Sequence, residues 1–216
     1  MSLKNLGLKN AFELNNFKSL IPESLDNIKT NNADCVTLCT FSRVSEDKGI
    51  LDAIQAVARA NDVLGNEENR IFLDIYGPIA KDFKDKLDSF LEKNDVAKYK
   101  GVVDYNNSAF VLKNYFCLLF PTYYIGEGVA GTIVDASFAG IPIIATDWNM
   151  NKESIVDGYN GFLVPVKDPN KIAESIIYLY NNRDEHYKMC VNSLKLSEKF
   201  NPKNVLQKVF DFIESD

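Results

Sequence analysis

The chain has 216 residues, of which 46% are hydrophobic and 25% charged, a composition typical of a globular protein with a sizeable core. Its formal net charge of −6 argues against nucleic-acid binding, because proteins that bind nucleic acids concentrate Lys and Arg on one face. No apolar run approaches the length of about 20 residues that a membrane span needs, and the N-terminus lacks a signal-peptide core. We therefore expect a cytoplasmic protein without a membrane span.

The cysteine and histidine content argues against two kinds of site. The four cysteines show neither zinc-ligand spacing nor a compact disulfide framework, so we expect buried, reduced thiols. The only histidine, His186, lies among charged residues near the C-terminus, and any Ser-His-Asp or Cys-His centre would depend on it. We expect neither a metal or other cofactor nor histidine-based catalysis.

Residues 1–32 contain Asn-rich patches and only weak periodicity, which predicts a lead-in or interdomain remnant before one domain over residues 33–216. Within that domain, short apolar runs rich in β-branched and aromatic residues predict strands. The predicted strands are Val36 to Phe41, Ile71 to Tyr76, Tyr99 to Val103, Cys117 to Phe120, Ile141 to Thr146 and Gly161 to Val164.

Apolar residues at helical spacing follow the first two strands, among them Ile50, Ile54 and Val57 after the first and Phe83 and Leu87 after the second. Strands that alternate with helices pair in parallel through right-handed crossovers. The pattern therefore predicts an α/β fold with a doubly wound, mainly parallel, Rossmann-like sheet. Three C-terminal helices are predicted to close it, at Pro169 to Asn181, Asp184 to Phe200 and Pro202 to Glu214.

Ligands of open α/β sheets bind beyond the carboxyl ends of the strands, so the segments after each strand are the candidate sites. The first such loop carries Arg43 and Lys48, which together could neutralise a diphosphate without Mg²⁺. The alternative is a solvated loop in which these cations pair with Glu46 and Asp47. The loop alone does not decide between the two.

A glycine-rich loop follows the predicted strand that ends at Phe120. Gly126, Gly128 and Gly131 permit close backbone approach, and a helix that begins near Thr132 would direct its free N–H groups at an anion. The loop and the helix start therefore predict a phosphate site.

Two carboxylates belong to this second segment. Glu127 lies in the loop and Asp135 in the first turns of the helix, so one could meet sugar hydroxyls and the other a ribose diol. For Asp135 an alternative stays open, because Thr132-x-x-Asp135 fits a capping-box-like pattern in which Asp135 accepts from a backbone N–H at the helix start. For Glu127 we favour a functional role.

Four segments of the chain together resemble motifs of one known family. They are Ser42-Arg43-Val44 with Lys48-Gly49, Gly101-Val102-Val103, Glu127-x7-Asp135 and the run from Asp157 to Pro169. Over roughly residues 37–182 the chain resembles the C-terminal domain of glycosyltransferase family 4, often called group 1 glycosyltransferases. The resemblance implies one half of the two-domain GT-B architecture, with the acceptor bound by an N-terminal domain that is missing here.

The resemblance also implies roles for residues. Arg43 and Lys48 would contact the donor diphosphate, Glu127 the donor sugar and Val102 the nucleotide base. Asp135 would take the place of the glutamate that binds ribose, and Ser42 replaces a usual glycine. Further donor contacts would come from Gly128, Val129, Ala130, Gly131 and Thr132.

The implied activity is a retaining, metal-independent transfer of sugar from a UDP- or GDP-sugar to an acceptor hydroxyl, in polysaccharide or glycoconjugate synthesis. The isolated half is expected to be inactive. A second hypothesis is a non-catalytic, degenerate module that binds a nucleotide sugar or a partner, since Ser42 and Asp135 depart from the family pattern. A dinucleotide-binding oxidoreductase lacks support, because no Gly-x-Gly-x-x-Gly opens the first helix.

Overall fold

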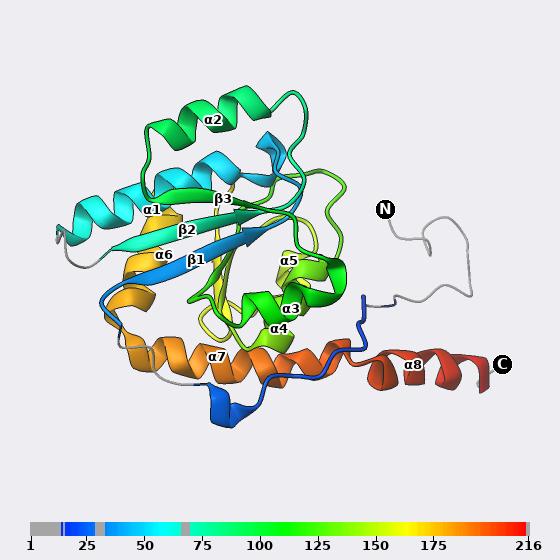
Figure 1. The fold of residues 1–216 in the computed structure, drawn as a ribbon. Coiled ribbons are helices and arrows are strands. Elements are labelled where there is room, and N and C mark those ends of the chain that lie inside the picture. The colour runs from blue at the N-terminus through cyan, green and yellow to red at the C-terminus, as the bar shows by residue number, and fades with distance from the viewer. Residues whose placement is uncertain (1–13, 15, 29–32, 66–69, 215–216) are drawn as a thin grey trace.

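A computed structural model describes residues 14, 16–28, 33–65 and 70–214. Its centre is a parallel six-stranded sheet with strand order β3-β2-β1-β4-β5-β6 (Figure 1). The strands are β1 Val36–Phe41, β2 Ile71–Tyr76, β3 Ala97–Gly101, β4 Leu118–Phe120, β5 Ile143–Thr146 and β6 Gly161–Val164. The expected doubly wound α/β fold is confirmed.

Helices cover both faces of this sheet. They are α1 Ile50–Leu64, α2 Lys84–Glu92, α3 Ser108–Leu112, α4 Gly131–Ala139, α5 Asn151–Ser154, α6 Pro169–Asn181, α7 Arg183–Ser197 and α8 Pro202–Glu214. Helices α1 and α6 pack against each other on one face, whereas α4 packs between α3 and α7 on the other. Figure 1 shows α8 extending beyond the layers of the sheet.

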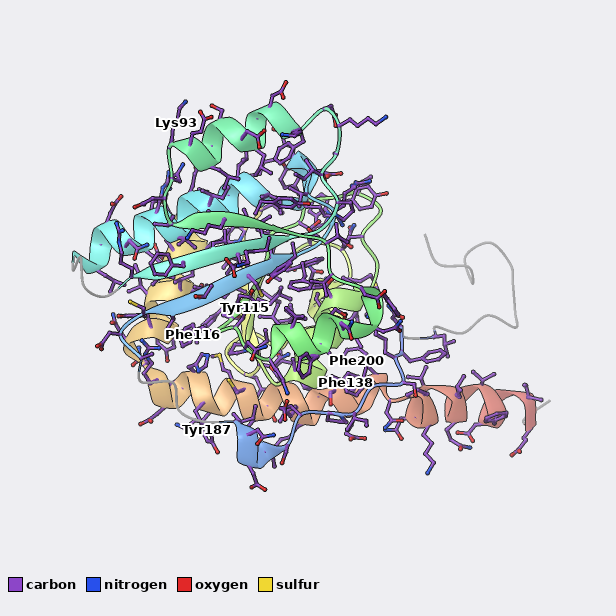
Figure 2. The ribbon with its side chains drawn as sticks, viewed as in Figure 1. Lys93, Tyr115, Phe116, Phe138, Tyr187 and Phe200 are labelled. Atoms are coloured by element: carbon purple, nitrogen blue, oxygen red, sulfur yellow. The ribbon has the colours of Figure 1, made fainter. Side chains whose placement is uncertain are left out.

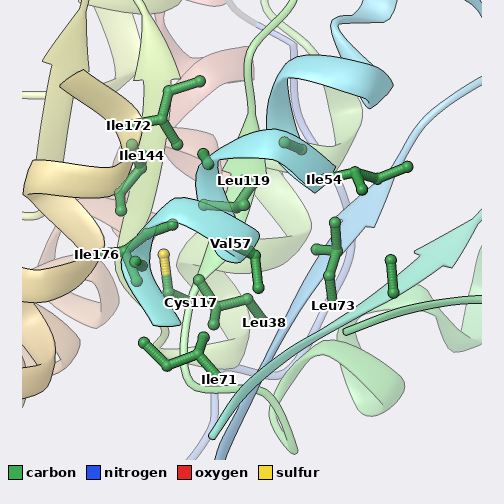
Figure 3. Close-up of a cluster of buried hydrophobic side chains, with 14 of the residues drawn as sticks. Leu38, Ile54, Val57, Ile71, Leu73, Cys117, Leu119, Ile144, Ile172 and Ile176 are labelled. Atoms are coloured by element: carbon green, nitrogen blue, oxygen red, sulfur yellow. The ribbon is translucent and has the colours of Figure 1, made fainter. Parts of the chain in front are cut away.

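The alternation of side chains along each strand builds one core on each face. In β1, Leu38 points into the core under α1 and α6, whereas Cys39 points into the core that contains Ile133 of α4. Figure 3 shows the first of these cores, with Ile54 and Val57 of α1 among the side chains packed around Leu38. Because both faces are covered, the strands read as nearly continuous apolar runs.

Several predicted boundaries differ from the structure. The third strand was expected at Tyr99 to Val103 but runs Ala97–Gly101, because Gly101 has a φ of 88° and ends the strand. The next two strands begin at Leu118 and Ile143, each later than expected. The helix expected at Asp184 to Phe200 ends at Ser197 and is followed by a 3₁₀ turn, Glu198–Phe200.

Residues 16–28, here called the N-terminal segment, run across the α7 side of the body (Figure 1). The Lys18 N–H donates to the Phe200 carbonyl at 3.2 Å and the Glu23 N–H donates to the Phe138 carbonyl at 2.8 Å. Phe138 and Phe200 pack together in a small apolar cluster, and both are labelled in Figure 2. Part of the lead-in predicted over residues 1–32 thus contacts the body, while residues 1–13, 15 and 29–32 lie outside the described residues.

His186 of α7 is a packing residue. Its ring stacks on Phe116 with centroids 3.9 Å apart, and its Nε2 is 2.7 Å from the Phe116 carbonyl oxygen. Burial lowers the pKa of His186 to about 4, with Arg183 adding repulsion of the charged form. The imidazole is therefore neutral at pH 7, far from the carboxyl ends of the strands.

This burial predicts a pH-dependent stability. The unfolded chain protonates His186 near pH 6.5 and the folded chain only near pH 4, so stability that is present above pH 6.5 is lost as pH falls through that window. The full loss is about 3 kcal/mol, at about 1.4 kcal/mol per pKa unit. Urea unfolding between pH 7 and 4 should show a shallower decline for His186→Gln than for the wild type. Parallel declines would contradict this account.

Candidate functional site

The strand order reverses between β1 and β4, and the loops that follow these strands surround the candidate site. In a doubly wound sheet such a reversal leaves a crevice at the carboxyl ends of the strands. The loop after β1 ends at Gly49, whose φ is 66° and where an added Cβ would lie 2.2 Å from the Pro121 carbonyl oxygen. The Tyr123 N–H donates to the Asp47 carbonyl at 2.9 Å. The two loops therefore touch, and only glycine fits at their contact.

The first of two cavities here, the Lys48 cavity, has a volume of about 320 Å³. It brings together most of the residues that the sequence predicted for the diphosphate and the sugar. Its lining residues are Ser42, Arg43, Lys48, Phe120, Tyr124, Glu127, Ala130, Gly131 and Thr132.

A nearly buried ion pair between Lys48 and Glu127 holds this cavity in shape. The two side chains are only 11% and 10% exposed. The Thr122 hydroxyl donates to Glu127 Oε2 at 2.8 Å, and Lys48 Nζ lies 4.7 Å from the centroid of the Tyr124 ring. Lys48 thus pairs with Glu127 of the other loop rather than with the acids of its own loop.

Arg43 is held more loosely. Its side chain is 50% exposed, and its Nη2 lies 3.2 Å from Asp47 Oδ2. Such an exposed pair is worth little, so the guanidinium can turn to an anion at small cost. The alternative, a solvated loop whose cations pair with its own acids, therefore holds for Arg43 in the free protein. It does not hold for Lys48, which pairs with Glu127 of the other loop.

Helix α4 begins at Gly131, one residue before the expected Thr132. The N–H groups of Ile133 and Val134 donate to the Ala130 carbonyl, and the Thr132 hydroxyl donates to the Phe41 carbonyl at 2.8 Å. The amides of Gly131 and Thr132 are first-turn amides without an i−4 partner in the helix. Both residues line the Lys48 cavity, so the positive end of the helix adds to the two cations there.

Asp135 does not cap this helix, and the capping-box interpretation is wrong. The N-cap is Ala130, and the Asp135 carboxylate instead accepts from Lys18 Nζ at 2.6 and 2.7 Å. The Ser108 hydroxyl donates to Asp135 Oδ2 at 2.5 Å. Neither Lys18 nor Ser108 was predicted as a partner, because no local pattern connects residues that lie 117 and 27 positions from Asp135.

A second cavity, the Asp135 cavity, has a volume of about 280 Å³ and shares Ser42, Gly131 and Thr132 with the first. Its other lining residues are Lys18, Phe41, Tyr76, Gly77, Pro78, Val102, Val103, Tyr105, Ser108 and Asp135. Polar groups thus gather at one end, around Asp135, and aromatic and aliphatic side chains line the rest. The cavity suits a ligand with a polar and a flat apolar part, joined to an anion in the Lys48 cavity.

The other predicted donor contacts fall in different places. Val102 lines the Asp135 cavity. Gly128 and Val129 line neither cavity, and the Val129 carbonyl accepts from Asn16 Nδ2 at 3.2 Å. A larger cavity of about 560 Å³ lies under the N-terminal segment, but its charged residues Glu23 and Lys113 pair with each other.

The residues that the structure describes lack two features, a membrane-spanning helix and a metal-binding cluster. None of the helices in this part of the chain has both the length and the apolar character needed to cross a bilayer. Over the same residues, His, Cys, Asp and Glu side chains nowhere gather in threes as they would around a metal ion. The cytoplasmic location stays a prediction.

The burial of the Lys48–Glu127 pair predicts a large effect on stability. Glu127→Ala should lower the free energy of unfolding by about 3 kcal/mol, because it leaves a nearly buried ammonium without its partner. Denaturant unfolding checks this. The control is Asp88→Ala, which breaks the exposed pair with Lys84 and should leave the midpoint unchanged. Equal small effects in both variants would argue against a structural role for the pair.

Several known proteins are similar to this chain in sequence. The chain is 25% identical over 190 residues to an uncharacterised glycosyltransferase of Methanocaldococcus jannaschii, which covers 87% of this chain and 45% of that protein. It is also 25% identical over 171 residues to the poly(glycerol-phosphate) alpha-glucosyltransferase of Bacillus subtilis, covering 77% of this chain and 24% of that protein. The chain therefore spans less than half the length of these two relatives.

A solved structure gives the same fold. It is a variant of S. aureus TarM in complex with fondaparinux, alpha-GlcNAc-glycerol and UDP, with a TM-score of 0.77 and 21% identity over 97% of this chain and 41% of that one. The family model for glycosyl transferases group 1 matches residues 23–196. Because that match covers most of the chain, this protein belongs to the group 1 glycosyltransferases, as its sequence motifs implied.

Proposed function

We propose that this chain is the donor-binding half of a retaining glycosyltransferase that moves a sugar from a UDP- or GDP-sugar to an acceptor hydroxyl. The observation that carries the proposal is the pair of adjoining cavities at the reversal of strand order. One holds cations and a helix N-terminus, and the other holds a carboxylate beside apolar walls. A nucleoside diphosphate has the same two parts in the same order.

The diphosphate belongs in the Lys48 cavity. Arg43 can grip phosphate oxygens with two N–H groups, Lys48 supplies a compact charge, and the first amides of α4 can donate as well. When the bond to the sugar breaks, negative charge grows on the leaving phosphate, and these donors already face it. We propose that they carry out this role without a metal ion.

The sugar belongs beside Glu127. Its carboxylate can accept hydrogen bonds from sugar hydroxyls while Lys48 and Thr122 fix its orientation. The base belongs in the Asp135 cavity near Val102, and Asp135 near the ribose. Gly128 and Val129 would contact a donor only indirectly, because they line neither cavity.

The names of similar proteins support the proposed transfer from a nucleotide sugar. UDP is bound in the TarM structure, and the B. subtilis relative is named for glucosyl transfer to poly(glycerol phosphate). These names favour UDP over GDP as the donor nucleotide and glycoconjugate or polysaccharide assembly as the setting. Both remain part of the proposal.

A second domain would complete the enzyme. Phe210 and Ile213 of α8 are 55% and 63% exposed, an apolar surface that an acceptor-binding domain could cover. The alternative is a non-catalytic module, suggested by Ser42 and Asp135. The Lys48–Glu127 pair favours donor binding over partner contact alone, because it sets a cation and a carboxylate in the wall of a cavity.

Nucleotide titration tests donor binding. By isothermal calorimetry the chain should bind UDP or GDP with millimolar or tighter affinity, and Arg43→Ala should weaken binding about tenfold, the loss expected for one charged hydrogen bond. Arg70→Ala is the control, since Arg70 also forms an exposed ion pair, with Asp95, but precedes β2 at the opposite end of the sheet. Absence of binding to either nucleotide would favour the degenerate module.

The stereochemistry and metal dependence need a chain that includes the acceptor-binding domain. We expect the transferred sugar to keep its anomeric configuration, measured by proton NMR of the product, and the rate to be unchanged by EDTA. Inversion would refute the retaining assignment. A rate that EDTA abolishes and Mg²⁺ restores would refute the proposed role of Arg43 and Lys48 as the groups that replace a metal.

A further inference from the structure

Lys18 is the one residue of the N-terminal segment that lines the Asp135 cavity. Its ammonium pairs with both Asp135 oxygens, and the two side chains are 6% and 5% exposed. Lys18 Nζ also lies 3.9 Å from the centroid of the Tyr105 ring. The ammonium is thus held on two sides, at the polar end of the cavity.

The pair is more than an anchor for the segment. Desolvation of the two charges offsets much of their attraction, so a buried ion pair adds little to the stability with which the N-terminal segment is attached. The segment is already fastened by backbone hydrogen bonds from Lys18 and Glu23, and by the ion pair between Glu23 and Lys113 at 3.1 Å. The position of this charged pair in the cavity wall therefore indicates that it contacts a ligand.

We infer that Lys18 is a specificity residue for the nucleoside, and that Lys18 and Asp135 together form hydrogen bonds with the ribose diol. This inference rests on the proposed donor function. Each ribose hydroxyl both donates and accepts a hydrogen bond, whereas a carboxylate can only accept. Lys18 supplies the missing donor. Asp135 can therefore accept a hydrogen bond from one ribose hydroxyl while Lys18 donates one to the neighbouring hydroxyl.

The hydrogen-bond inventory leaves room for this. The carboxylate has about four acceptor positions, and Lys18 and Ser108 use three of them, which leaves one on Oδ1. Lys18 has three N–H donors, and two of them point at Asp135. The ion pair also cancels a negative charge that would otherwise repel a diphosphate in the adjoining cavity.

The length of the side chain at position 135 fits the same account. Aspartate is one methylene shorter than glutamate, so its carboxylate stays close to α4 and is 3% exposed as a residue. The long Lys18 side chain reaches it alongside the first turn of the same helix, where an added Cβ on Gly131 would lie 3.5 Å from Lys18 Cε. Lys18 thereby brings a polar group to the space that a longer acid would fill.

The test compares UDP with 2′-deoxy-UDP and 3′-deoxy-UDP by calorimetry, or the matching GDP series if GDP is the nucleotide that binds. The wild type should prefer the ribonucleotide. Lys18→Met should weaken UDP binding about 10- to 100-fold, the range for a lost charged hydrogen bond, and should reduce its preference over at least one deoxy analogue. Lys113→Met is the matched control, because it breaks the other ion pair of the segment outside both cavities and should change neither quantity.

A thermal scan of each variant shows whether it folds. If Lys18→Met does not fold, the double variant Lys18→Met with Asp135→Asn removes both charges and leaves neither unpaired, and it should show the same loss of discrimination. Undiminished UDP affinity with unchanged discrimination would overturn the inference, and so would tighter binding, which would mean that Lys18 occupies the subsite. If Arg43→Ala weakens UDP binding and the Lys18 variants do not, the inference alone fails. If the wild type binds no nucleotide, the proposed function fails as well.

Discussion

Between β1 and β4 the order of the parallel strands reverses, and the loops that leave these two strands enclose the space above the sheet. The groups proposed to contact the diphosphate and the sugar depend on this reversal. It places Arg43 and Lys48 on the wall formed by one loop and Glu127 on the wall formed by the other, and the start of α4 lines the same cavity. The contact of Gly49 with Pro121 fixes how far apart the walls lie.

The charges in this space are balanced before any ligand arrives, but not equally firmly. Arg43 shares an exposed pair with Asp47, worth at most about 1 kcal/mol, whereas Lys48 and Glu127 are almost excluded from water. A diphosphate can therefore draw Arg43 away from Asp47 easily. The Lys48–Glu127 pair would persist, with each member adding a contact to the ligand, because separating the two charges costs far more.

Much of the fold could be predicted because local signals are strong where a strand or helix has a clear start or stop. The Asp168-Pro169 pair, for example, gave the start of α6, where Asp168 accepts from the Asn170 and Lys171 N–H groups at 3.1 Å. The end of β3 was misplaced because Val102 and Val103 look like strand residues, while Gly101 turns the backbone away before them. Apolar character alone does not report that turn.

The candidate site likewise has one part that the sequence predicts and one part that it does not. Arg43, Lys48 and Glu127 could be brought together from sequence, because each follows a strand of one parallel sheet and the carboxyl ends of such strands share an edge. The environment of Asp135 could not, because Lys18 reaches it from a segment with only weak periodicity and Ser108 from a separate short helix. Pairing between distant segments is set by the packed body rather than by spacing.

That packed body connects Lys18 to the core by a short path. The Lys18 N–H bonds to the carbonyl of Phe200, whose ring packs with Val134 and Phe138 of α4, the helix that carries Asp135. Both partners of the ion pair therefore depend on the same apolar cluster, one through its backbone and the other through its helix. Since interiors are close-packed, a cavity in this cluster would shift the ammonium and the carboxylate relative to each other. The geometry of the nucleoside end of the site is in this way set by the junction of the N-terminal segment, α4 and the turn before α8.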